Sequence, residues 1–233
     1  MNMQLPFKYR LICEGPSEWV YVQRLKSFLT GKMPLMDDGF TPRLDFYPTI
    51  TNNKIGGGSF GLVKRTYKKI CPQNRHLPLR IWVDCDIYIR NSNKNECASA
   101  TGYASKGTMP DFNFMVMNFE DFLAMHFQDA LFETWKGIMD NEHHFAVPLH
   151  SKEYVPKFEP IWKEYLGAAE GADTIYRKGS LPEDFVTIES LCNMIRHCDD
   201  TKLSTLFSIH APSGAFPEFL SKALKDAYPE VFV

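Results

Sequence analysis

The chain has 233 residues, of which 44% are hydrophobic and 23% charged, and its formal net charge is −2. These values are ordinary for a soluble globular protein, and they do not indicate a strongly basic nucleic-acid-binding protein. No apolar run approaches the length needed to span a bilayer, so no membrane association is expected. The 6 cysteines form no C-x-x-C pair. Together with an N-terminus unlike a signal peptide, they favour reduced thiols in the cytoplasm.

The first 135 residues alternate between short apolar runs and stretches with helical periodicity. In chain order the predicted elements are strand 9–14, helix 17–29, strand 43–48, helix 59–70, strand 79–83, strand 111–117 and helix 119–135. A long polar loop, residues 87–110, separates the last two strands. This order predicts an α/β fold with a mostly parallel sheet flanked by helices.

The last hundred residues show helical patterns and no strand pattern. Helices are predicted over residues 157–169, 186–197 and 215–227. We therefore expect two parts, an α/β core over residues 1–135 and a helical C-terminal extension over residues 136–233, packed on the core as a cap.

Acidic residues follow two of the predicted strands. Glu14 ends the first strand, and Asp84 and Asp86 follow strand 79–83. If these strands are parallel neighbours, their carboxyl ends lie at one edge of the sheet, where ligands of such sheets bind. Asp84 and Asp86 are two apart, so they point the same way from an extended chain. The cluster repels itself unless it holds a divalent cation, which prefers carboxylate oxygens.

Two further candidates lie in the predicted helix 119–135. Glu120, at its start, is either a fourth metal ligand or an acid that stabilises the positive end of the helix dipole. His126 lies six residues later, so it points in a different direction from Glu120. It either reaches substrate or is a buried, hydrogen-bonded histidine.

Basic residues near these acids are candidates for contacts with a phosphate backbone. Lys64 and Arg65 follow the Gly-rich loop 56–61, Lys106 lies in the long polar loop, and Lys178 comes late in the chain. For each of them, a solvated position on the surface is the alternative.

The order of these motifs resembles the Toprim fold, and within it the RloB-like proteins. The motifs are Glu14-Gly15 with Ser17-Glu18 and Tyr21, Asp84-x-Asp86, the run from Phe119 to Phe127, and Tyr176-Arg177-Lys178. The resemblance covers about residues 9–130, and beyond them only the short match at Tyr176-Arg177-Lys178 continues it. It implies Mg²⁺- or Mn²⁺-dependent phosphoryl transfer, with Asp84 and Asp86 holding metal and Glu14 acting as a ligand or as a general acid or base.

The resemblance implies a nuclease that hydrolyses phosphodiester bonds in DNA or RNA, with a place in bacterial antiphage defence. RloB-like relatives also suggest a partner, such as an ATPase encoded nearby. Two alternatives stay open. One is a non-catalytic module that binds nucleic acid, nucleotide or a partner protein. The other is a hydrolase or transferase that acts on small phosphorylated molecules.

Overall fold

The computed structural model describes residues 5–51, 60–84, 112–114, 118–142, 149, 151–167, 175–201 and 215–233. The strands in these ranges are β1 (Phe7–Cys13), β2 (Leu44–Ile50), β3 (Leu79–Val83) and β4 (Phe112–Phe114). The helices in these ranges are α1 (Pro16–Lys32), α2 (Phe60–Ile70), α5 (Phe119–Ala124), α6 (Asp129–Asn141), α7 (Ser151–Tyr165), α8 (Ile188–Thr201) and α10 (Phe216–Ala227).

The four strands form one sheet in the order β2-β1-β3-β4, and every neighbouring pair is parallel. The predicted α/β fold with a mostly parallel sheet flanked by helices is therefore confirmed. The central strand β3 has the predicted bounds, and its apolar run is buried on both faces, as expected for a parallel strand covered by helices. Strand β2 lies at one edge and contains Pro48, which is compatible with an edge position.

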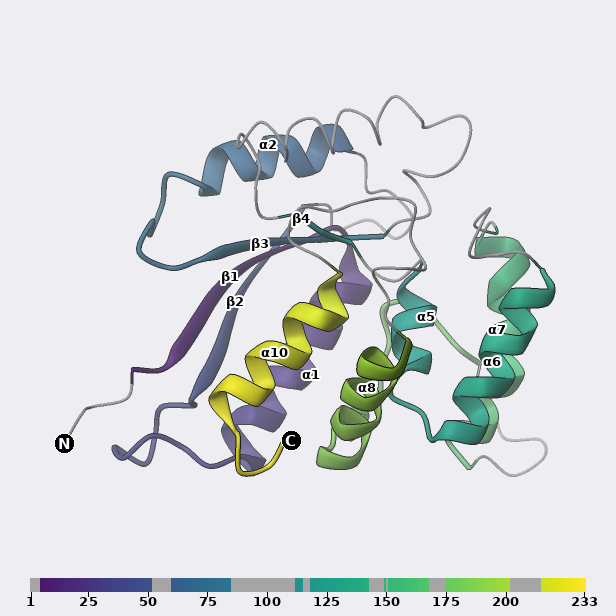
Figure 1. The fold of residues 1–233 in the computed structure, drawn as a ribbon. Coiled ribbons are helices and arrows are strands. Elements are labelled where there is room, and N and C mark those ends of the chain that lie inside the picture. The colour runs from purple at the N-terminus through teal and green to yellow at the C-terminus, as the bar shows by residue number, and fades with distance from the viewer. Residues whose placement is uncertain are drawn as a thin grey trace.

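Helices cover both faces of the sheet. In Figure 1, α2 lies on one face, α1 and α10 lie on the other with α8 next to α10, and α5, α6 and α7 lie beyond the carboxyl ends of the strands. The core between the sheet and α10 contains Trp82 of β3, whose ring stacks on that of Phe216 at a centroid distance of 3.7 Å. The carboxyl edge of the sheet therefore faces the helices that follow β4.

The prediction of one helix over residues 119–135 is wrong, because the chain turns between α5 and α6. Met125, His126 and Phe127 are all buried. The backbone N–H groups of His126 and Phe127 donate to the carbonyls of Leu123 and Ala124, three residues earlier and not four as in an α-helix. Gln128 follows in an extended conformation as the N-cap residue of α6, so the chain leaves the direction of α5 before the next helix starts.

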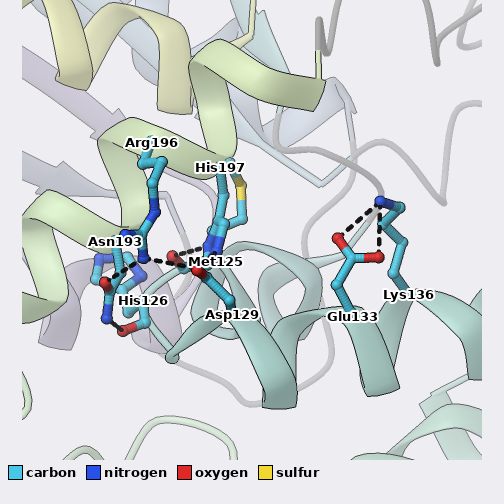
Figure 2. Close-up of polar contacts among 8 residues, drawn as sticks. All are labelled: Met125, His126, Asp129, Glu133, Lys136, Asn193, Arg196 and His197. Atoms are coloured by element: carbon cyan, nitrogen blue, oxygen red, sulfur yellow. Dashed lines mark hydrogen bonds and ion pairs between the residues drawn. The ribbon is translucent and has the colours of Figure 1, made fainter.

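Side chains of α8 bind two carbonyl groups at this turn. His197 Nδ1 donates a hydrogen bond to the carbonyl of Met125 at 2.9 Å, and the Asn193 amide donates to the carbonyl of His126 at 3.3 Å. Figure 2 shows these contacts together with Asp129, whose carboxylate lies 3.0 Å from His197 Nε2. The break in the helix is therefore stabilised by α8, which comes about 70 residues later in the chain.

Helix α7 begins six residues before the predicted start at 157. Pro156 and Pro160 lie inside it. A proline inside a helix removes a backbone hydrogen bond, which is why the sequence favoured a later start. The helix continues because Tyr154, Phe158 and Trp162 are buried along one side of it.

The helical C-terminal extension is present and shares one hydrophobic core with the sheet. Residues of α8 and α10 belong to the same buried cluster as those of β1 and β3. The predicted boundary at residue 135 falls inside α6, and the division into two parts stays a prediction.

Candidate functional site

Two predicted acids meet at the carboxyl edge of the sheet. β1 and β3 are parallel neighbours, with Cys13 opposite Trp82, so Glu14 and Asp84 leave the sheet side by side. The backbone N–H of Asp84 donates a hydrogen bond to Glu14 Oε2 at 3.0 Å. Both residues are largely withdrawn from solvent. The third predicted acid, Asp86, lies outside the described residues.

A third carboxylate, Glu18, joins this edge from the first turn of α1. Its Oε2 accepts a hydrogen bond from the backbone N–H of Gly15 at 2.8 Å, as in a capping box. Burial raises the pKa of Glu18, and the nearby carboxylate of Glu120 raises it further, while the ammonium of Lys178 lowers it. Sequence reasoning gave Glu18 no role of its own, although its spacing from Gly15 is that of a cap.

Glu120 is the fourth carboxylate, and it is completely buried at the start of α5. The hydroxyl of Tyr176 donates to its Oε1 at 3.0 Å, and Lys178 Nζ lies 3.5 Å from the same oxygen. Its other oxygen, Oε2, is buried without a hydrogen-bond partner among the described residues. Burial raises the pKa of Glu120, whereas Lys178 and the hydroxyls of Tyr176 and Tyr154 lower it.

Tyr176 is in electrostatic contact with several of these acids. Burial raises its pKa well above 10, and the charges of Glu120, Asp84 and Glu18 raise it further. Its hydroxyl is therefore a hydrogen-bond donor at neutral pH and not a phenolate. We define the acidic cluster as Glu14, Glu18, Asp84 and Glu120.

Lys178 is held in this cluster by the segment around it. Lys178 Nζ donates to the hydroxyl of Tyr154 on α7 at 2.5 Å. The next residue, Gly179, has φ of 80°, a conformation that favours glycine. A Cβ built on Gly179 would lie 3.6 Å from Cβ of Pro16, so this turn packs on the start of α1. Arg24 of α1 fixes the segment further by donating to the carbonyl of Leu181 at 3.0 Å.

The donor chemistry of the cluster suits a hard divalent cation, because it consists of carboxylate oxygens. Within the described residues, no group of three or more His, Cys, Asp or Glu side chains is arranged to hold a metal ion. Glu14 and Asp84 place two acidic residues at adjacent strand ends, and the third predicted ligand follows Asp84 by two residues. Glu120 accepts a hydrogen bond from Tyr176 and lies beside Lys178, in the first turn of α5. Its two predicted roles, as a fourth metal ligand or as an acid that stabilises the positive end of the helix dipole, stay predictions.

The predicted phosphate-contact residues lie in different places. Lys64 and Arg65 are on the first two turns of α2, with Lys64 half-buried and Arg65 exposed. Lys106 lies outside the described residues. Lys178 points into the acidic cluster and keeps 28% of its side chain exposed.

The prediction that His126 contacts substrate is corrected by its burial, and the alternative of a buried, hydrogen-bonded histidine describes it. The hydroxyl of Tyr21 donates to Nε2 at 2.8 Å, and Nδ1 donates to the carbonyl of Phe122 at 3.0 Å. Both ring nitrogens are therefore used inside the protein. Burial lowers the pKa of His126 from 6.5 to about 3, so the ring is neutral at physiological pH.

None of the helices in the described residues is long and apolar enough to cross a membrane. No family model, curated protein or solved structure matches the chain. What the chain does is therefore inferred from its own side chains.

Proposed function

We propose that this protein is a divalent-metal-dependent nuclease of the Toprim type, which hydrolyses phosphodiester bonds in DNA or RNA. The observation that supports this most is the contact between the Asp84 backbone N–H and the Glu14 carboxylate. It brings acids from two neighbouring parallel strands together at the carboxyl edge of the sheet. Acids in this position are suited to bind a metal ion and the phosphate that it neutralises.

In this proposal, Glu14, Asp84 and Asp86 hold one Mg²⁺ or Mn²⁺ ion. When bound, the metal offsets phosphodiester charge and lowers the pKa of a coordinated water. Glu14 also assists proton transfer, since its carboxylate lies beside the same ligands. Lys64, Arg65 and Lys106 hold the nucleic-acid backbone. A role in antiphage defence, with an ATPase or other defence protein as partner, belongs to the same proposal.

The test is cleavage of a panel of single- and double-stranded DNA and RNA with Mg²⁺, Mn²⁺ or EDTA. We expect Glu14→Gln and Asp84→Asn each to reduce cleavage by more than roughly 100-fold, since the loss of even an outer-shell partner costs 10–100-fold. The amide introduced by Glu14→Gln keeps an oxygen that accepts the Asp84 N–H, so the fold is preserved. Asp140→Asn, at an exposed position of α6, is the matched control and should cut like the parent.

If Glu14→Gln cuts as fast as the parent while remaining folded by circular dichroism, the assigned roles are wrong.

The second candidate is a non-catalytic module that binds nucleic acid, nucleotide or protein. It is favoured by the observation that no three-acid metal group is present within the described residues. Binding of a panel member that EDTA leaves unchanged, with no cleavage in either metal, would support this module and contradict the nuclease.

A further inference from the structure

The carboxylates of the acidic cluster fall into two pairs with different partners. Glu14 and Asp84 are joined by the Asp84 backbone N–H, at the ends of β1 and β3. Glu18 and Glu120 interact with each other and with the ammonium of Lys178. The Glu18–Glu120 pair therefore lies beside a cation that belongs to the protein itself, whereas the Glu14–Asp84 pair lies at the ends of two neighbouring strands.

From this division we infer that Lys178 is a built-in cation that occupies the Glu18–Glu120 half of the cluster, and that it limits the site to one divalent metal ion. Removing the charge of Lys178 should open a second divalent-cation site between Glu18 and Glu120. This inference rests on the proposed metal-dependent function and specifies its metal stoichiometry.

The geometry shows that the ammonium is fixed in place. Lys178 Nζ lies 3.5 Å from Glu120 Oε1 and 2.5 Å from the hydroxyl of Tyr154. The turn at Gly179 packs against Pro16, and Pro16 is two residues before Glu18. The ammonium therefore reaches the cluster from a segment that packs on the start of α1, and its positive charge would repel a divalent ion in this half.

The second carboxylate oxygen of Glu120 points to a cation as the ligand of the Glu18–Glu120 half of the cluster. Its side chain is fully buried, and its Oε2 has no hydrogen-bond partner in the part of the chain that is described. Tyr176 and Lys178 both use Oε1. Without the ammonium, Glu120 and Glu18 would be two buried carboxylates that repel each other, and a hard cation is the ligand that offsets such a pair.

The experiment counts Mn²⁺ ions by isothermal titration and by electron paramagnetic resonance of free Mn²⁺. We expect one ion in the parent, two in Lys178→Met, and one again in the double variant Lys178→Met/Glu120→Gln. Lys178→Arg keeps the charge and should bind one ion. The matched control Lys152→Met, at an exposed position of α7, should also bind one ion.

A second measurement does not depend on how Lys178→Met folds. In the otherwise unchanged protein, Glu120→Gln should alter Mn²⁺ affinity by less than about threefold. If Glu120 were a metal ligand, the same substitution should weaken Mn²⁺ binding more than tenfold, because replacing even outer-shell residues costs about 10–100-fold in metal affinity. Three results would each overturn the inference and leave the nuclease proposal standing. They are two bound ions in the parent, one bound ion in a folded Lys178→Met, and a tenfold loss of Mn²⁺ affinity in Glu120→Gln. No bound ion in the parent would overturn both.

Discussion

At the scale of single residues, the molecule keeps two kinds of titratable group in its interior. The carboxylates of Glu18 and Glu120 are close to the cation of Lys178, whereas His126 is neutral and lies among aromatic rings. The sequence indicated Glu14 and Asp84 because they follow apolar runs, and Glu120 because it lies at the start of a predicted helix, and both patterns are visible in one dimension. It could not indicate Lys178 as the partner of Glu120, because that contact spans 58 positions and depends on how α7 and the segment at 176–181 pack.

The buried histidine makes stability depend on pH. The folded pKa of His126 is lowered to about 3, while an unfolded histidine titrates near 6.5. Between these values the unfolded state binds more protons, so this contribution is fully present above pH 6.5 and is lost as the pH falls. We expect His126 to cost about 1 kcal/mol of unfolding free energy between pH 6.5 and 5.5, and about 1.4 kcal/mol for each further pH unit down to about 4.

Urea unfolding at pH 6.5 and 5.5 measures this contribution. His126→Gln has no ionisable group but can still bond Tyr21 and Phe122, so its loss of stability over this interval should be smaller than that of the parent by about 1 kcal/mol. His76→Gln, at an exposed position, is the control and should follow the parent. An equal pH dependence in the parent and His126→Gln would contradict a neutral buried ring.

At the scale of elements, helix ends depend on side chains that come from elsewhere in the chain. Arg10 of β1 is buried at the C-terminal end of α2, where its guanidinium donates to the carbonyls of Ile70 at 2.8 Å, Leu77 at 3.0 Å and Gln73. A cation at this end of a helix also opposes the negative end of the helix dipole. The register of β1 therefore fixes where α2 stops.

Replacing Arg10 by Met should destabilise the protein by about 2–3 kcal/mol, because several buried carbonyls lose a charged donor. Lys at this position should recover only part of the loss, since an ammonium cannot copy the planar fork of a guanidinium. Thermal and urea unfolding measure both variants. The exposed neighbour Arg75, replaced by Met, should change stability by less than about 0.5 kcal/mol. Equal effects at positions 10 and 75 would show that the buried contacts contribute little.

Most helices and strands could be predicted from the sequence, but the break between α5 and α6 could not. Strand 79–83 was found with the same bounds because an apolar run lies between Pro78 and an acid. The break between α5 and α6 was missed, since the amide of Asn193 and the imidazole of His197 that bind its carbonyls lie on α8. Local periodicity carries no information about a partner about 70 residues away.

At the scale of the whole molecule, the C-terminal helix α10 contributes to the core of the sheet. Phe216 is fully buried and stacks on Trp82 with an interplanar angle of 10°. Sequence patterns predicted a helix at 215–227 and a cap on the core. They could not predict that this helix provides the aromatic partner of the central strand.

Phe216→Ala should therefore cost about 3–5 kcal/mol of unfolding free energy, the usual range for a large aromatic side chain lost from a core. Phe40→Ala removes the same atoms from a position that is 85% exposed, so its effect should stay within about 0.5 kcal/mol. Because one core joins the two predicted parts, fluorescence and circular dichroism should report the same transition in Phe216→Ala. A separate, earlier transition of the helical part would show that it unfolds independently.

The edge position of β2 has a consequence for how copies of the chain behave at high concentration. Thr51 donates its backbone N–H to Cys13, so odd-numbered residues of this strand face β1 and even-numbered residues face outward. Pro48 therefore offers no N–H on the outer side, and the ammonium of Lys26 already occupies the outward carbonyl of Phe46 at 2.5 Å. A strand from another copy would find a missing donor and a blocked acceptor, which protects this border of the sheet against fibre growth.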